Sequence, residues 1–302
     1  MQWIMGERYM IKRILMLAMM LLYTLLPVGE GAFDLNGRKS AFAMDGKDAF
    51  VLINREDAVN CIRDNFMAHE NEFTLIMNKN TLMDLLQDVD LLYAAALLDD
   101  AATSRDSDYL KANVISWEAK WHMDKMDLAR LTISADYRTT LKQEELLEKE
   151  LASAIEFIDM KNATDYDKVK AIHDYIIDMV SYDQSLSKYS AYDALIDKSA
   201  VCLGYAAAAY RMFTDAGIES RIIAGLAGDE EHVWNIVKVD GEWYNIDLTW
   251  DDPILDNGQD MVSYDFFLKN ENDFYDHVRT DEYNTEDFLY NYKIAETSYT
   301  MK

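Results

Sequence analysis

The sequence predicts an α+β protein in which a group of helices comes before an antiparallel sheet. Apolar side chains recur at helical spacing in LKQEELLEKELASAIEFIDM and VKAIHDYIIDMV, which cover residues 141–160 and 169–180. Three β-prone runs follow, SRIIAGLAG, HVWNIVKV and EWYNIDLTW. Asp240-Gly241, between the last two runs, is a strong turn signal for a β-hairpin. Because helices and strands are grouped along the chain, the class is α+β.

The second of the two helices is expected to begin near Thr164, where Asp167 completes a capping box. Its apolar stripe places His173 and Asp174 beside the core; the stripe consists of Val169, Ile172, Ile176 and Val180.

The first 43 residues have the pattern of a targeting segment. Lys12 and Arg13 precede an apolar run, Ile14 to Val28, that suits a signal-peptide core and is short for a membrane span. Small residues follow, and Ala41-Phe42-Ala43 offers a cleavage site. We therefore expect residues 1–43 to be a signal peptide or an N-terminal anchor. The protein is then secreted or at the cell surface, with membrane anchoring as the alternative.

Residues 44–140 are predicted to form a smaller α+β module of unknown role, followed by a second domain over residues 141–302. FVLI and EFTLIMN are predicted strands, residues 56–68 and 80–98 predicted helices, and YLKANVISWEAKWHM with DLARLTISADYRT a predicted hairpin. Cys61 lies on the first helix and is interpreted as a small buried hydrophobe. A disulfide with Cys202 is the open alternative. The remaining isolated histidines, His69, His122 and His277, are interpreted as structural.

Net charge and missing motifs exclude several function classes. The formal net charge is −26 at pH 7, and such a surface repels nucleic acid and anionic membranes. We expect no nucleic-acid partner and no membrane contact beyond the N-terminal segment. The sequence has no HExxH, paired CxxC or P-loop motif, so neither a metal nor a cofactor is expected. The carboxylate-rich run from Asp251 to Asp260 lacks the EF-hand spacing and is interpreted as a solvated turn.

Cys202 lies where an alanine-rich helix begins, in SAVCLGYAAAAYRMF. If Ser199 caps this helix, Cys202 is its third residue, and the positive end of the helix dipole favours a thiolate. Gly204 and the alanines allow the helix to pack closely against its neighbours. A buried structural cysteine explains this stretch equally well.

A histidine and an aspartate downstream complete a possible nucleophilic site. A thiol nucleophile needs a base, and the base needs a group that orients it. With Asp240-Gly241 as a two-residue loop, Trp234 faces Asp247, and His232 projects from the same face. A three-residue loop would put Asp247 on the opposite face. Trp234, Ile236 and Trp243 share the predicted face and form an apolar wall; Asn235 points to the other face, and Asp251 is a weaker substitute for Asp247.

The segments AYDALIDKSAVCLGYAAAAYRMFTDAGI and HVWNIVKVDGEWYNIDLTWDDP carry a family resemblance. In the order and spacing of their Cys, His-x-Trp-Asn and Asp-x-Thr-Trp-Asp-Asp-Pro elements, residues 166–264 resemble the transglutaminase-like superfamily of papain-type thiol enzymes. The resemblance implies a core in which the cysteine helix packs on an antiparallel sheet. Many relatives have glycine where this chain has Ala200.

The resemblance implies acyl transfer, with Cys202 as nucleophile, His232 as general base and acid, and Asp247 as the residue that orients the imidazole. The Cys202 N–H is the expected oxyanion donor, with Tyr192 as the candidate side-chain donor and Gly204 and Trp234 in support. Water that resolves the thioester makes the protein a hydrolase, and an amine makes it a transamidase.

Hydrolysis of a protein, peptide or peptidoglycan-peptide substrate is favoured over transamidation. The alternatives are a catalytically inert domain that binds cell-wall or protein ligands, and a structural assembly protein.

Overall fold

The computed structural model describes residues 41–302 except for positions 45–46, 53, 88–91, 93–95, 98–102, 125–126, 159–162, 254–261 and 301–302. The predicted leader lies outside these residues apart from its distal Ala41-Phe42-Ala43 site, which belongs to the first strand. Residues Ala41–Lys302 form one compact unit. Its fold is α+β, as predicted.

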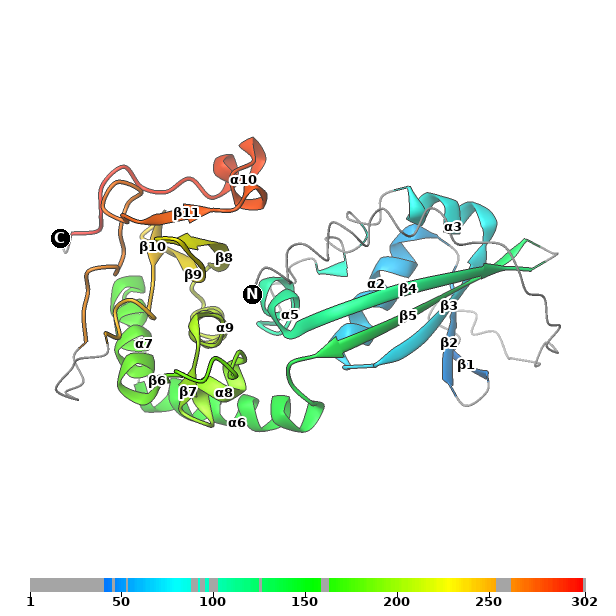
Figure 1. The fold of residues 1–302 in the computed structure, drawn as a ribbon, viewed down its shortest axis with the longest axis horizontal. Helices are drawn as coiled ribbons and strands as arrows, with labels where there is room; N and C mark the ends of the chain where they lie inside the picture. The colour runs from blue at the N-terminus through cyan, green and yellow to red at the C-terminus, as the bar shows by residue number, and fades with distance from the viewer. Residues whose placement is uncertain are drawn as a thin grey trace. The chain divides into compact units, whose positions relative to one another are not determined.

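The N-terminal part of this unit contains a five-stranded sheet in the order β1-β2-β3-β5-β4 (Figure 1). The strands are β1 Ala41–Met44, β2 Lys47–Val51, β3 Glu72–Asn78, β4 Val114–Met123 and β5 Leu128–Tyr137. Only β2 and β3 pair in parallel, since helix α2, Arg55–Met67, connects them; α3, Lys79–Leu86, follows β3. Apolar side chains of α2, α3, β3 and β5 form one core, which includes Cys61.

One predicted strand begins later than expected. Residues Ser107–Asn113 form a helix, α5, and β4 starts at Val114. The side chains of Tyr109 and Leu110 are buried on this helix. Tertiary packing therefore overrides the alternating pattern that predicted a strand from Tyr109 onward.

The C-terminal part contains helices on one face of a four-stranded sheet in the order β10-β9-β8-β11. The helices are α6 Leu141–Ile158, α7 Asp165–Met179, α8 Ala191–Leu195 and α9 Cys202–Asp215, and the strands are β8 Ser220–Ala227, β9 Glu230–Val239, β10 Glu242–Ile246 and β11 His277–Arg279. A two-stranded parallel pair, β6 Ser181–Tyr182 with β7 Ser199–Ala200, precedes α9, and η1 Asp281–Tyr283 and α10 Glu286–Asn291 follow β11. The predicted capping box at Thr164 is present.

Helix α9 lies between the sheet and helices α6–α8 (Figure 1). Its four consecutive alanines are all buried, so their small side chains allow the close packing that the sequence predicts. The opposite face of the sheet carries a second apolar cluster, which contains Trp234, Ile236 and Trp243 as predicted. The strands therefore bury both of their faces.

Helix α5 of the N-terminal part packs on α9 and β8. Asp108 accepts two hydrogen bonds from the Arg221 guanidinium, at 2.6 and 3.0 Å, and one from the Ile222 N–H. Tyr109 belongs to the same apolar cluster as the helices of the C-terminal part. The division into domains at residue 140 stays a prediction.

Candidate active site

Cys202 is the first residue of α9 rather than the third. Val201 occupies the N-cap position, and the structure gives it no side-chain capping bond. The prediction that Ser199 caps the helix is wrong, because Ser199 pairs with Ser181 in the β6–β7 ladder. The first N–H groups of a helix have no intrahelical acceptor, so the N–H of Cys202 is placed where it can bind an anion.

Gly204 holds the first turn of α9 close to the preceding chain. A Cβ atom at this position would lie 2.5 Å from the Ala200 Cβ and 3.0 Å from the Ser190 carbonyl oxygen. Any larger residue would push Cys202 away from these neighbours.

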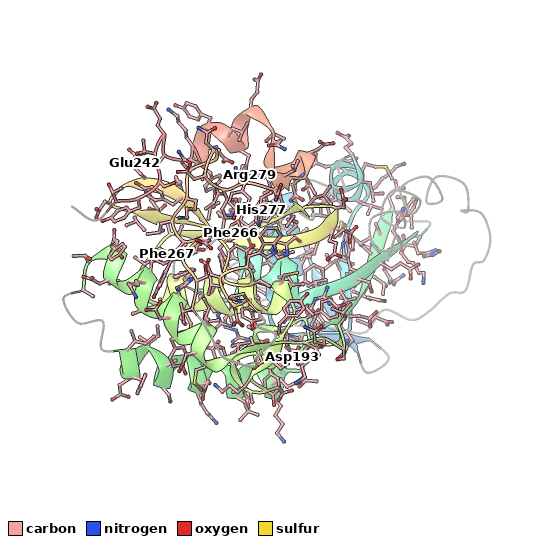
Figure 2. The ribbon with its side chains drawn as sticks, turned by 60° about the vertical axis from the view of Figure 1, so that its left-hand side comes forward. Asp193, Glu242, Phe266, Phe267, His277 and Arg279 are labelled. Carbon is pink, nitrogen blue, oxygen red and sulfur yellow. The ribbon has the colours of Figure 1, made fainter. Side chains whose placement is uncertain are left out.

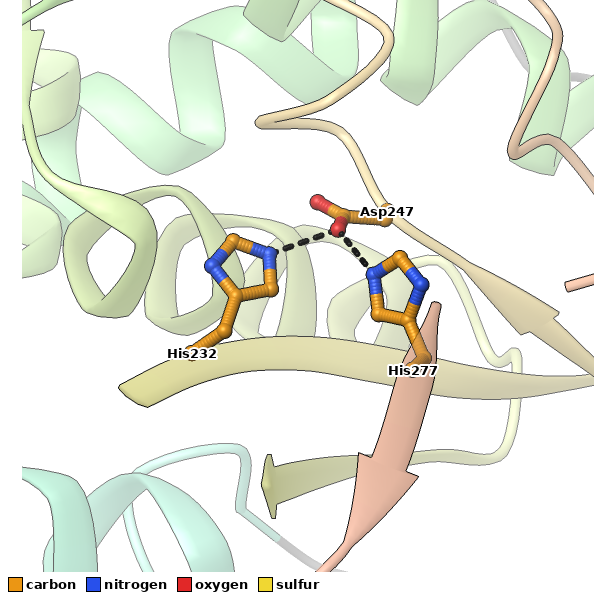
Figure 3. A group of neighbouring side chains, drawn as sticks. All are labelled: His232, Asp247 and His277. Atoms are coloured by element: carbon orange, nitrogen blue, oxygen red, sulfur yellow. Dashed lines mark hydrogen bonds and ion pairs between the residues drawn. The ribbon is translucent and has the colours of Figure 1, made fainter. Parts of the chain in front are cut away.

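The β9–β10 hairpin has the predicted register. Glu242 pairs with Val239 and Ile246 with Asn235, so Asp240 and Gly241 form the two-residue turn. Both turn residues have positive φ, which is the requirement of a type I′ turn. The register places His232 and Asp247 on one face, and the His232 Nε2 lies 2.6 Å from the Asp247 Oδ2 (Figure 3). Asn235 faces the other way and donates to the Ala206 carbonyl on α9.

A second imidazole contacts the same carboxylate oxygen. The His277 Nε2 lies 2.9 Å from the Asp247 Oδ2, and the His277 Nδ1 lies 2.9 Å from the Tyr275 carbonyl (Figure 3). Strand β11 brings His277 here by pairing with β8, opposite Ala227. The interpretation of His277 as isolated is therefore wrong. No motif connects it with Asp247, because a long-range strand pairing creates the contact.

Both oxygens of the Asp247 carboxylate accept hydrogen bonds. Its Oδ1 accepts from the backbone N–H groups of Thr249, at 2.9 Å, and Trp250, at 3.2 Å. The residue is 0% exposed. Burial alone would raise the pKa of Asp247, but the two histidines outweigh it and lower the pKa to about 2. The group is therefore a carboxylate at neutral pH.

His232 is held as the cation that matches this carboxylate. Burial would lower the pKa of His232, but Asp247, and then the Cys202 side chain, outweigh it and raise the pKa to about 10. Since Nε2 faces Asp247, the Nδ1 side of the ring is left for the interaction with Cys202. The structure thus brings all three predicted residues into one connected group.

A cavity of about 360 Å³ opens over Cys202 and His232. Among the described residues its lining is Tyr182, Cys202, Ala227, Glu230, Glu231, His232, Thr249, Trp250, Asp252 and Pro253. Tyr192, the predicted side-chain donor, lies on α8 and does not belong to this lining. Tyr182, which the sequence analysis missed, does. Burial and then the nearby Cys202 raise the pKa of Tyr182, so its hydroxyl keeps its proton.

Trp234 supports the site from behind. It is buried and stacks on His232 with ring centroids 6.3 Å apart.

Asp251 orients a different histidine. Its Oδ2 lies 3.2 Å from the Nε2 of His173, and its Oδ1 accepts from the Phe266 N–H at 2.9 Å. His173 contacts Asp174 through Nδ1 at 3.0 Å. Burial would lower the pKa of His173, but the two carboxylates raise it. Asp251 is fully buried, so the interpretation of this position as a solvated turn is wrong; residues 254–260 of that run lie outside the described residues.

Neither cysteine is in a disulfide. Cys61 is buried on α2, and neither thiol is bonded to another cysteine. The alternative of a Cys61–Cys202 bridge is therefore wrong in this structure.

Among the described residues, His232, Asp247 and His277 form a group that could hold a metal ion, since one ligand atom of each lies within 4.8 Å of the others. The Nε2 atoms of both histidines contact the Asp247 Oδ2.

Comparison with known proteins finds a family model that matches part of the chain. Residues 153–248 match the model of the transglutaminase-like superfamily. Kyphoscoliosis peptidase from Homo sapiens is 28% identical over 132 residues, which cover 38% of this chain and 20% of that protein; its Mus musculus counterpart is 26% identical with the same coverage. The chain thus spans about a fifth of the length of these curated relatives.

Solved structures give more distant likenesses. A TGase crystal structure is 16% identical, with 69% of this chain and 63% of that chain covered and a TM-score of 0.32. The periplasmic domain of TgpA from Pseudomonas aeruginosa is 20% identical, with 40% and 54% covered and a TM-score of 0.29.

Within the described part of the chain, no helix combines the length and the apolar character needed to cross a membrane.

Proposed function

We propose, from the match of residues 153–248 to the model of the transglutaminase-like superfamily, that the protein is a cysteine-dependent acyl-transfer enzyme acting on amide bonds. One observation carries the proposal. His232 contacts the buried Asp247 on one side and interacts with Cys202 on the other, at the wall of a cavity. A base oriented by a carboxylate beside a thiol is the arrangement that nucleophilic catalysis requires.

The proposed reaction starts from the thiolate of Cys202 and the imidazolium of His232. The thiolate attacks the amide carbon, and the C–N bond breaks as the His232 proton passes to the leaving amine. A thioester to Cys202 remains. Neutral His232 then takes a proton from a water molecule while the oxygen of that water attacks the thioester carbon, and the acid product leaves. The C–S electrons return to the sulfur.

The Cys202 N–H at the start of α9 is the proposed donor to the oxyanion in both steps. Tyr182 replaces Tyr192 as the proposed side-chain donor, because it lines the same cavity as Cys202 and lies close enough for the Cys202 side chain to raise its pKa.

Hydrolysis is the proposed outcome, on a protein, peptide or peptidoglycan-peptide substrate. The peptidase name of the human relative supports hydrolysis over transamidation. Export from the cytoplasm remains part of the proposal and depends on the leader sequence. The alternative is an inert binding domain. Ligand binding alone does not require the buried His232–Asp247 pair beside Cys202.

Alkylation of the thiols tests the proposal. We expect iodoacetamide at pH 6 to label Cys202 at least about ten times faster than an unstructured cysteine peptide, because the imidazolium partner favours the thiolate. Intact mass and peptide mapping give the rate at each site. His232→Ala should remove the acceleration, Cys202→Ala should remove the label, and Cys61→Ala is the matched control that should leave the rate unchanged.

An alkylation rate of Cys202 that equals the rate of the peptide, and that does not change in His232→Ala, would contradict the enzyme proposal. Release of new amino termini from peptide substrates and incorporation of a fluorescent primary amine then distinguish hydrolysis from transamidation.

A further inference from the structure

We propose that His277 is a positioning residue of the Cys202–His232–Asp247 site, holding the Asp247 carboxylate from the side opposite His232 and sharing its Oδ2 oxygen. The inference rests on the proposed function, since it assigns His277 a part in setting the proton affinity of the proposed base. The two imidazoles approach one oxygen from two strands, β9 and β11 (Figure 3).

Both ring nitrogens of His277 face hydrogen-bond acceptors. The Tyr275 carbonyl can only accept, so the Nδ1 of His277 donates to it. The Asp247 carboxylate also only accepts, so the Nε2 of His277 donates as well. Both partners of His277 are therefore acceptors, and Asp247 lies between the rings of His232 and His277.

Sharing one oxygen between two donors has a consequence for the proposed base. A carboxylate oxygen that binds His232 alone would hold the His232 proton more strongly than one that is shared between two imidazole rings. His232 must release its proton to the leaving amine in the proposed reaction. His277 thus limits how strongly Asp247 retains that proton, while it also fixes the carboxylate orientation.

The ring of His277 has little freedom to move. Its side chain is 1% exposed. The rings of Phe274 and Trp250 lie 4.0 and 4.7 Å from it, centroid to centroid. Phe266 lies beside it at 5.4 Å (Figure 2). Packing on several sides keeps the Nε2 directed at Asp247.

The β8–β11 pairing fixes the backbone that carries His277. Gly225 on β8 pairs with Arg279, and a Cβ atom there would lie 2.2 Å from the Val278 carbonyl oxygen. The same atom would lie 2.6 Å from the Trp234 ring. Only glycine permits this approach of β11 to the wall behind His232.

Other titratable groups face this cluster and belong in any account of its pH dependence. They are Cys202 on α9, Glu230 and Glu231 on β9, Tyr182 on β6, and Asp251 and Asp252 in the segment after β10. Among them, Asp251 acts on Asp247 through its charge and is itself bonded to His173. These groups stay in place in the variants described next, so a change in His232 titration reports on His277.

Titration of the His232 imidazole by NMR, in the full chain with ¹³C-labelled histidine, tests the proposal. His277→Phe keeps an aromatic ring in the cluster and removes both donors. We expect the His232 titration midpoint to rise by about one pH unit in this variant, because Asp247 then acts on His232 alone. His277→Gln can still donate from its side-chain amide, and its midpoint should lie between those of the wild type and His277→Phe.

Phe288→Leu is the matched control, since Phe288 packs against the same apolar cluster through Tyr283 and Tyr292 and has no ring contact with His277. It should lower the melting temperature and leave the His232 midpoint unchanged. A His277→Phe midpoint equal to that of the wild type, in a folded protein, would show that His277 only packs and would overturn the inference. If His277→Phe does not fold, His277→Gln takes its place, and a wild-type midpoint in that variant overturns the inference in the same way.

The failure of this inference is distinguishable from failure of the proposed function. The NMR titration reads His232 directly and needs no substrate. Slow alkylation of Cys202 in the wild type would contradict the enzyme proposal. It would not affect the measured shift of the His232 titration midpoint in His277→Phe.

Discussion

Replacement of Asp247 by asparagine is the sharpest perturbation of the site. Asparagine has the shape of aspartate but carries no charge, and one of its oxygens becomes an NH₂ group. Two backbone N–H groups, from Thr249 and Trp250, donate to the Oδ1 position, so the amide oxygen is held there. The amide nitrogen then faces the Nε2 atoms of His232 and His277, where an acceptor is required.

The size of the effect follows from the charge state of His232. Its pKa is about 10 with Asp247 in place, and burial alone would take it below the ordinary value of 6.5. Loss of the carboxylate should therefore lower the pKa by at least about three units, which corresponds to about 4 kcal/mol of preference for the imidazolium. At pH 7 the imidazolium beside Cys202 is lost. We expect kcat to fall about 10⁴-fold, in line with a base held in the wrong tautomer.

Two measurements check this prediction. NMR titration of labelled histidine should place the His232 midpoint at or below pH 6.5 in Asp247→Asn, with His232→Gln used to assign the signal. Iodoacetamide labelling of Cys202 at pH 6 should slow toward the rate of a free peptide. A His232 that still titrates near pH 10 in Asp247→Asn would refute the reasoning, whatever happens to activity.

Three further predictions concern stability. The pKa of His232 is raised above its unfolded value, so its contribution to the free energy of unfolding is complete below about pH 6.5 and is lost as the pH rises toward 10. The pKa of Asp247 is lowered, so its contribution to the free energy of unfolding is present above about pH 4 and is lost as the pH falls toward 2. The difference in melting temperature between wild type and Asp247→Asn should therefore be largest between about pH 4 and 6.5, and a flat difference up to pH 10 would contradict this. Gly204→Ala should lower the free energy of unfolding by about 1–3 kcal/mol in urea titrations, because its Cβ would overlap Ala200; unchanged stability would mean that the helix shifts without cost. Asp251→Ala removes one partner of the buried His173 pair and should cost about 3 kcal/mol by the same assay, with Cys202 labelling slowed less than in Asp247→Asn; equal slowing would place Asp251 in the site.

The sequence predicted the parts of the site that local chemistry determines. The Asp240-Gly241 turn sets the hairpin length, and the hairpin length sets which side chains share a face. The relation between His232 and Asp247 could therefore be worked out from the sequence. The assignment of roles to Cys202, His232 and Asp247 stays a prediction until the thiol is tested.

Contacts that depend on distant pairing could not be predicted in this way. His277 reaches Asp247 because β11 pairs with β8, which lies about fifty residues earlier in the chain. Tyr182 reaches the cavity of Cys202 because β6 pairs with β7. Ser199 has the composition of a helix cap, but the same pairing takes its backbone into a strand. In each case the partner is chosen by tertiary packing, which no short sequence pattern encodes.

The contact between α5 and the helix that carries Cys202 bears on how the chain can be shortened. Arg211 of α9 is fully buried and donates to the Ser104 hydroxyl at 2.8 Å, and its guanidinium lies over the Tyr109 ring. A cut after residue 140 would remove Ser104 and Tyr109 from Arg211, together with the Asp108 carboxylate that binds Arg221. Arg211 would keep its contacts with Glu144 and Glu148 of α6, while Arg221 would lose the carboxylate that holds its guanidinium. The N-terminal residues therefore contribute contacts to the helix that carries Cys202, and a chain that begins at residue 141 is expected to be less stable than the full chain.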